Sequence, residues 1–368
     1  MKSLITKWQT LPLLLLAAMA AASCDMMEQD TSDCPYGLYV TFKYDYNLQR
    51  ADMFNDHVGS VTLYIFDEDG RLVKTQEESN RPGAAPLASP AYTMHIADLA
   101  PGRYRMIALA GQRPYADMQG TGRAVFTRSH LAPGDGMAAL DIRLDCERRG
   151  EGLYEVVNNA LPLDTLWHGM TSEPVEVFAR HSNRPSYDTI SLVRDTKKIN
   201  VALRELDDPT TMDIADYDLR ITDRNAHILW DNSLDETDTV VYTPHDTWNT
   251  GDRTGTAGSG GSPLDGIGRI GHADFMTSRI LYHDNNADDG RLTITNRLTG
   301  VRVADVNLPD LLSRLRTSED RYLYSEQEFL DRGYDYQVTF FLRGGKLDYI
   351  SIAISALGWS KRIQFEQL

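Results

Sequence analysis

The residues with the clearest chemical role are a cysteine and the small residues before it, Ala21-Ala22-Ser23-Cys24. An apolar run of about twelve residues, Leu11–Ala22, precedes this thiol and is too short to cross a bilayer as a permanent helix. This pattern is typical of a lipoprotein signal peptide, in which the cysteine is diacylated and becomes the first residue of the mature chain. We therefore expect residues 1–23 to be a lipoprotein signal peptide, Cys24 to carry lipid, and residues 24–33 to form an acidic tether.

The sequence contains two further cysteines, Cys34 and Cys146. If Cys24 carries lipid, an even number remains in an exported chain, which predicts a disulfide between these two. That bond would close a loop of about 110 residues, for which loop entropy allows about 4 kcal/mol of stabilisation. The alternatives are two free thiols and, because Ala21 stands where the strict signal prefers Leu, an ordinary signal peptide that leaves Cys24 free.

Other patterns that would perform chemistry are missing or incomplete. HExxH, P-loop, GxSxG and CxxC motifs do not occur. The segment Gly266–Gly271 matches GxGxxG, but it follows a Gly/Ser-rich loop rather than a strand, which dinucleotide binding requires. The segment Asp284–Gly290 resembles a calcium loop, but its order is broken by one residue, and a turn between hairpin strands at Ser278–His283 and Arg291–Thr295 explains it better. We expect no enzyme, cofactor or metal site.

The charge of the chain excludes several classes of partner. The net charge is −16, and removal of Lys2 and Lys7 with the signal peptide takes it to −18. Such a chain disfavours nucleic acid and anionic lipid surfaces. No second apolar run approaches 18 residues, so the predicted link to the membrane is the lipid on Cys24.

Period-two alternation of apolar residues dominates the rest of the chain and predicts strands, beginning with Tyr36–Tyr46. About seven strands in residues 34–147 indicate an N-terminal β-sandwich domain. The charged, Gly-containing segment Glu147–Gly152 marks the expected boundary. Residues 151–368 repeat the same pattern of short alternating strands separated by turns. They are expected to form a C-terminal β-sandwich domain with a Gly-rich loop at 246–268.

Several segments together resemble a known family. They are the tether with Cys34, YVTFKYDYN (Tyr39–Asn47), DMFNDHVGSVTLYIFDEDGRLV (Asp52–Val73), the Leu-x-Arg-x-x-x-Lys-Ile pattern (Leu192–Ile199), LDRGYDYQVTFFL (Leu330–Leu342) and Ile350–Trp359. In these segments the chain resembles the FimB-like fimbrial anchor and accessory subunits of type V pili. The resemblance covers nearly the whole mature chain.

The resemblance implies an all-β fold of two tandem transthyretin-like β-sandwich domains. It implies a lipid-anchored protein of the cell surface that attaches a fimbria to the outer membrane, ends its assembly, and contacts stalk subunits by strand addition. Stalk subunits of this family lose their first strand through cleavage after an arginine, whereas an anchor is expected to keep it. We therefore expect the strand at Leu38–Tyr46 to be retained and Arg50, which follows it, to stay uncut.

Two other functions are compatible with the sequence. A surface lipoprotein adhesin or tip subunit would bind glycan or host protein through the Gly-rich loop and exposed aromatic residues. Capture of a fimbrial polymer would favour the anchor, and glycan-array binding without polymer would favour the adhesin. A surface glycosidase is a more distant alternative, because none of the 53 acidic residues is marked out as a catalytic pair.

Overall fold

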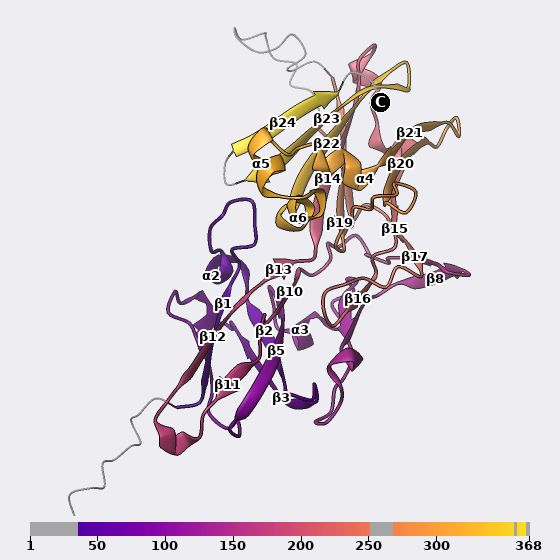
Figure 1. Cartoon of the computed structure of the whole chain (residues 1–368). Coiled ribbons are helices and arrows are strands. Elements are labelled where there is room, and N and C mark those ends of the chain that lie inside the picture. Colours follow the sequence, from indigo (N-terminus) through magenta and orange to yellow (C-terminus); the bar gives the residue numbers. More distant parts are fainter. Residues whose placement is uncertain (1–35, 251–267, 357–358, 366–368) are drawn as a thin grey trace, which may run out of the picture.

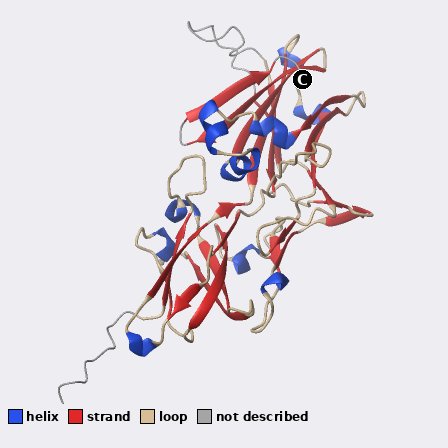
Figure 2. Cartoon of the chain, viewed as in Figure 1, coloured by secondary structure: helices blue, strands red, loops and turns tan. Residues whose placement is uncertain are grey.

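The computed structural model describes residues 36–250, 268–356 and 359–365, with backbone only for residues 355–356 and 359–365. Strands dominate these residues and helices are short (Figure 2), which confirms the predicted all-β fold. The strands lie in two lobes, with indigo and magenta strands in one and orange and yellow strands mainly in the other (Figure 1). No helix among the described residues has the length and apolar character needed to span a membrane.

The N-terminal sandwich packs a three-stranded sheet, β12-β1-β4, against a larger sheet, β13-β10-β5-β2-β3, in which β11 also pairs with β5. Apolar side chains of both sheets enclose a shared core. The β2–β3 hairpin turns at Gly70, whose φ of 71° suits glycine. The strands are β1 (Leu38–Lys43), β2 (Ser60–Phe66), β3 (Leu72–Ser79), β4 (Met94–Ile96), β5 (Gly102–Gly111), β10 (Leu166–Met170), β11 (Val175–Val177), β12 (Ser186–Ser191) and β13 (Val193–Arg194).

These sheets contain strands from both sides of the predicted boundary at Glu147–Gly152. Strand β10 pairs with β5, and β12 pairs in parallel with β1. The N-terminal sandwich thus takes four of its strands from residues 166–194. That residues 34–147 and residues 151–368 fold as two separate domains stays a prediction. After β13 the chain enters the C-terminal sandwich through β14, so it passes between the lobes at residues 194–197 (Figure 1).

The C-terminal sandwich packs the sheet β18-β19-β14-β22-β23-β24 against β21-β20-β15-β17-β9-β8. Its strands are β8 (Glu147–Gly150), β9 (Leu153–Glu155), β14 (Lys197–Glu205), β15 (Tyr217–Asp223), β17 (Thr239–Tyr242), β18 (Asp246–Thr250), β19 (Ile270–Thr277), β20 (Arg291–Asn296), β21 (Arg302–Asn307), β22 (Asp335–Arg343), β23 (Lys346–Ala356) and β24 (Trp359–Phe365). Three helices between β21 and β22 pack at the end that faces the other lobe (Figure 1): α4 (Leu308–Ser313), α5 (Ser318–Leu323) and α6 (Glu326–Arg332).

A third small sheet, β16-β7-β6, connects the cores of the two sandwiches. Its buried residues and those of the second face of the β2–β5 sheet belong to the same apolar cluster as the C-terminal core. The interior is therefore continuous from one lobe to the other. The remaining elements are β6 (Phe126–Arg128), β7 (Asp141–Leu144), β16 (His227–Leu229), α2 (Phe54–His57) and α3 (Tyr115–Met118).

Two sequence predictions about local structure are wrong. Ser278–His283 is not a strand and forms no hairpin with Arg291–Thr295. Strand β20 pairs instead with β15 and β21, because apolar alternation does not specify which segment pairs with a strand. The predicted loop at 246–268 begins with a strand, since Asp246–Thr250 pairs with β19. Residues 251–267 of that loop lie outside the described residues.

Candidate functional site: the first strand and the junction between the sandwiches

Strand β1 lies at the centre of its sheet, parallel to β12 and antiparallel to β4. Alternate side chains along the chain point into the core, and Leu38, Val40, Phe42 and Tyr44 are at most 3% exposed. Full burial of an apolar side chain of this size contributes about 1.5–3 kcal/mol. The strand that we expect to be retained therefore pairs with a neighbouring strand along each edge and buries its inner face in the core.

An aromatic stack crosses the outer face of the same sheet. The ring of Tyr39 on β1 stacks on His95 of β4, with centroids 4.3 Å apart, and on Tyr187 of β12, with centroids 5.4 Å apart. Because the three residues are register partners, the stack joins all three strands. Aromatic pairs of this kind contribute about 0.5–1.5 kcal/mol each beyond area burial.

The loop after β1 is cross-braced by two side chains. The fully buried Asn47 donates through Nδ2 to the carbonyl oxygens of Tyr44 (2.7 Å) and Ala51 (2.8 Å). The Asp52 carboxylate accepts hydrogen bonds from the backbone N–H groups of Tyr44 and Phe54. These hydrogen bonds therefore hold the start and the end of the loop against the end of β1.

Arg50, the arginine singled out in the sequence, is held by the opposite lobe. Its backbone has a left-handed φ of 54°, and Nη1 lies 3.1 Å from Oε1 of Glu319 on α5. Its guanidinium also lies 5.7 Å from the ring centroid of Tyr324. Arg332 packs over the rings of both Tyr324 and Tyr46, so the segment after β1 contacts the helices of the C-terminal sandwich.

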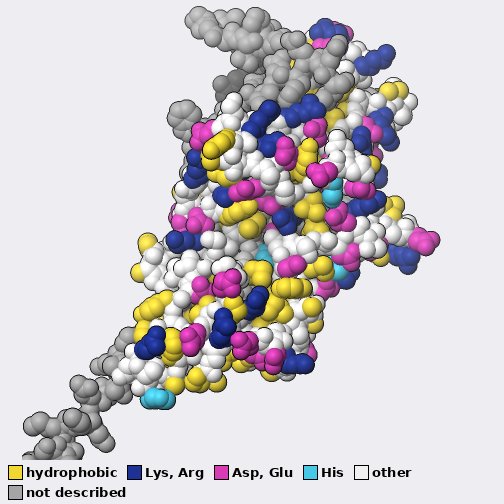
Figure 3. Space-filling model, in the orientation of Figure 1, with side chains coloured by type: hydrophobic (Ala, Val, Ile, Leu, Met, Phe, Trp, Pro, Cys, Tyr) yellow, Lys and Arg dark blue, Asp and Glu magenta, His cyan; other side chains and the backbone are white. Residues whose placement is uncertain are grey.

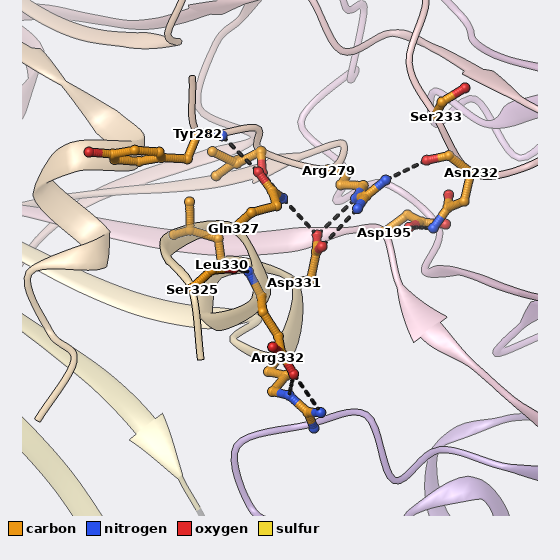
Figure 4. Close-up of polar contacts among 12 residues, drawn as sticks. Asp195, Asn232, Ser233, Arg279, Tyr282, Ser325, Gln327, Leu330, Asp331 and Arg332 are labelled. Carbon is orange, nitrogen blue, oxygen red and sulfur yellow. Dashed lines mark hydrogen bonds and ion pairs between the residues drawn. The ribbon is translucent and has the colours of Figure 1, made fainter. Parts of the chain in front are cut away.

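A buried charge cluster lies where the chain crosses between the lobes (Figure 4). Lys197, the first residue of β14, is fully buried, and its Nζ donates to the carbonyl oxygens of Leu330 (2.7 Å), Asp331 (2.9 Å) and Gly333 (2.8 Å). The carbonyl of Arg194 lies 3.2 Å away. The ammonium thus fastens the end of α6 to the crossover.

Arg279 and Asp331 form the ion pair at the centre of Figure 4, with guanidinium–carboxylate distances of 2.8 and 2.7 Å. Arg279 also donates to the carbonyl oxygen of Asn232, and the Asn232 side chain donates to the fully buried Asp195. Burial raises the pKa of Asp195 and lowers that of Lys197. Removing one member would leave buried polar groups unpaired, which is strongly destabilising.

The motif Leu192–Ile199 has its structural explanation here. The guanidinium of the nearly fully buried Arg194 lies 4.3 Å from the ring centroid of Tyr334 and 5.5 Å from that of Trp167. Trp167 is on β10, whereas Tyr334 precedes β22, so Arg194 bridges the two sandwiches. Sequence reasoning identified the motif only as part of a resemblance and did not assign it to a junction.

The predicted cysteine sites are only partly described. Cys24 and Cys34 lie outside the described residues. Cys146 lines a pocket of about 210 Å³, and burial raises the pKa of its thiol to about 12. The disulfide between Cys34 and Cys146 stays a prediction.

The two ligand-like motifs have other structures. Ile270 and Gly271 of the GxGxxG segment begin strand β19 rather than a helix. In the acidic loop, Asp289 accepts hydrogen bonds from His283 and Asn307. No group of three or more potential metal-ligating side chains occurs in the part of the chain that the structure describes. On the face drawn in Figure 3, acidic and basic side chains are interspersed.

A model of the family described as fimbrillin-A associated anchor proteins Mfa1 and Mfa2 matches residues 31–365. The chain belongs to this family. A search of curated proteins finds no match. Members of this family are structural proteins of fimbriae rather than enzymes, and we conclude that the chain is a fimbria-associated surface protein.

Solved structures from Bacteroides thetaiotaomicron and Porphyromonas gingivalis share the fold. A candidate adhesin from Bacteroides thetaiotaomicron is 26% identical, with a TM-score of 0.68 and coverage of 90% of this chain and 98% of that one. A candidate polysaccharide-binding protein from the same organism is 29% identical, with a TM-score of 0.65 and coverage of 90% and 100%. The fimbrial anchor protein Mfa2 from Porphyromonas gingivalis is 16% identical, with a TM-score of 0.58 and coverage of 89% and 99%, and shares the fold.

Proposed function

We propose that the chain is a lipid-anchored subunit that attaches a fimbria to the outer membrane and ends its assembly. The signal-like segment before Cys24 supports the lipid anchor, and membership of the Mfa2 family supports the fimbrial role. The acidic tether at 24–33 would separate the folded part from the membrane. Stalk subunits are the proposed partners, bound by strand addition.

The observation that carries this proposal is the position of β1. In strand addition, a donor strand from one subunit pairs with an open sheet edge or groove of another. Here the place between β12 and β4 is filled by the chain's own strand β1, with three of its side chains in the core. A subunit that is complete in this way offers no groove at that position to a further subunit, as expected for the end of a polymer.

The surroundings of Arg50 support retention of β1. A protease must accommodate an extended segment on both sides of the bond that it cuts. This loop has a conformation that is not extended, since Arg50 has a left-handed backbone. The side-chain hydrogen bonds of Asn47 and the ion pair between Arg50 and Glu319 hold it there. We expect the mature protein to begin at Cys24 and to remain intact at Arg50.

Fractionation of cells that carry Cys24→Ala, compared with wild type and with Cys34→Ala, tests the proposal. We expect intact mass to show lipid on wild type and Cys34→Ala in the outer membrane. We expect Cys24→Ala to be lipid-free and to release long, loosely attached fimbriae. Unchanged fimbriae in the Cys24→Ala strain, or a wild-type chain cut after Arg50, would refute the anchor function.

The second candidate function is that of a tip subunit or adhesin for glycan or host protein. The two Bacteroides thetaiotaomicron relatives, described as a candidate adhesin and a candidate polysaccharide-binding protein, favour it. Immunogold labelling of fimbriae separates the two functions. Label at the base of each fimbria supports the anchor, and label at the distal end supports the tip subunit.

A further inference from the structure

The outer face of the β18–β24 sheet contains a groove of about 330 Å³. Since Ile199, Val201 and Leu203 of β14 point into the core, the alternate residues of that strand, such as Ala202, face outward. The groove has a floor of small residues in one cross-strand row, in which Ala202 pairs with Thr339 and Thr339 with Ser351. Small residues in the middle of a sheet face leave room that larger neighbours enclose.

Aromatic rings stand beside this floor. His272 is the register partner of Ala202 on the next strand, and its ring stacks on Trp248 with centroids 4.9 Å apart. Phe341, in the row beyond Thr339, lines the groove and stacks on Tyr349 with centroids 4.2 Å apart. Burial lowers the pKa of His272, so that its imidazole is neutral at pH 7.

Polar groups line the opposite end and one side. Asn200 and Gln337 form the row that precedes the floor and present side-chain amides. Arg204 forms the row that follows it, beside Phe341. Asn200 donates to Asp274, which leaves the amide of Gln337 as the exposed donor and acceptor.

Arg204 lacks a hydrogen-bond or ion-pair partner among the residues that the structure describes, although the whole chain carries a net charge of −16. Arg204 and His272 both line the groove. A guanidinium binds a carboxylate through two parallel hydrogen bonds, and such bonds are stronger than neutral ones. The groove therefore has a cationic group that no described residue neutralises.

We propose that this groove binds a short oligosaccharide that carries a carboxylate. The half-buried imidazole of His272 suits the apolar C–H face of a sugar ring. The amide of Gln337 and the hydroxyl of Thr339 suit its hydroxyl groups, and Arg204 suits its carboxylate. The volume lies at the small end of the range for ligand pockets, about 300–1,000 Å³, which fits a short ligand. The inference goes beyond fimbrial attachment and would hold for an anchor or a tip subunit.

Isothermal titration of the full mature chain in detergent tests the inference with two acidic probes. Trigalacturonate represents uronic acids and 3′-sialyllactose represents sialic acids. The methyl ester of each is its matched neutral probe. We expect one acidic probe to bind at least about tenfold more tightly than its neutral partner, since a hydrogen bond to a charged group contributes about 1.5–3 kcal/mol. The preferred acid then identifies the source of the ligand.

Variants assign the binding to the groove. We expect Arg204→Gln and His272→Ala each to weaken the acidic probe at least about tenfold, whereas Arg220→Gln on the other sheet should have no effect. Unchanged melting temperatures would show that the variants fold.

Three results would overturn the inference: binding of neither acid, equal binding of a neutral probe, or equally tight binding of hexaglutamate. Arg204→Gln should leave fimbriae attached to cells, which separates failure of this inference from failure of the anchor function.

Discussion

The loop after β1 allows a quantitative test of why Arg50 should stay uncut. Asn47→Ala removes two hydrogen bonds, to the carbonyl oxygens of Tyr44 and Ala51, although the Tyr44 oxygen keeps the backbone N–H of Met53 as a donor. A hydrogen bond of this kind contributes about 0.5–1.5 kcal/mol, so we expect local opening of the loop to become easier by about 1–3 kcal/mol. That change corresponds to an increase of about 5-fold to 150-fold in the open population.

Limited trypsin digestion measures this population, because cleavage follows the open fraction when opening and closing are fast. The rate of cleavage after Arg50, followed by mass spectrometry, should rise by the same factor in Asn47→Ala. Asp56→Ala, a truncation of an exposed side chain on α2, is the matched control and should cleave as slowly as wild type. Equal rates for Asn47→Ala and wild type would refute the reasoning, and faster cleavage at all sites would indicate global unfolding instead.

Other contacts give predictions of stability and covalent structure. Lys197→Met leaves three buried backbone carbonyls without their donor, and urea denaturation should show a loss of about 3–5 kcal/mol. The exposed Lys198→Met is the control and should lose under about 0.5 kcal/mol, and equal midpoints for the two variants would contradict this. Burial lowers the pKa of His168 from 6.5 to about 4. As the pH falls below 6.5, the unfolded chain is therefore protonated at this histidine before the folded chain is. About 3 kcal/mol of the free energy of unfolding that is present above pH 6.5 should be lost as the pH falls towards 4. His168→Gln should flatten that profile, and an unchanged profile would exclude this histidine. Reduction should change the mass of purified protein by one disulfide, and should not do so in Cys146→Ser; free thiols in wild type would refute the pairing with Cys34.

Much of the fold was predictable where local pattern and burial agree. Alternation at Leu38, Val40 and Phe42 specified both a strand and the face that is buried. Asn307 and Ser325 cap helices α4 and α6 with side-chain hydrogen bonds, so a local residue type marks where each helix begins. Helix α5 has a capping box but is only six residues long, with no buried residue to give an apolar period.

The candidate site was less predictable. The sequence marked β1 and Arg50 through a resemblance, but it gave no sign that Glu319, distant in sequence, is the partner of Arg50. The same holds for the groove, whose floor and walls come from four different strands. Each residue there has an ordinary type and spacing, so only its neighbours across the sheet distinguish it.

The sequence by itself determined the strand-rich class, the family and the signal-like segment before Cys24, because each depends on residues that are close together in the chain. Only the tertiary structure decided that β12 lies beside β1, that Lys197 is buried at the junction and that β10–β13 belong to the N-terminal sandwich. The physical reason is that alternation specifies which face of a strand is buried, whereas backbone ladder bonds are available to any neighbouring strand. The choice of neighbour depends on packing of the whole core.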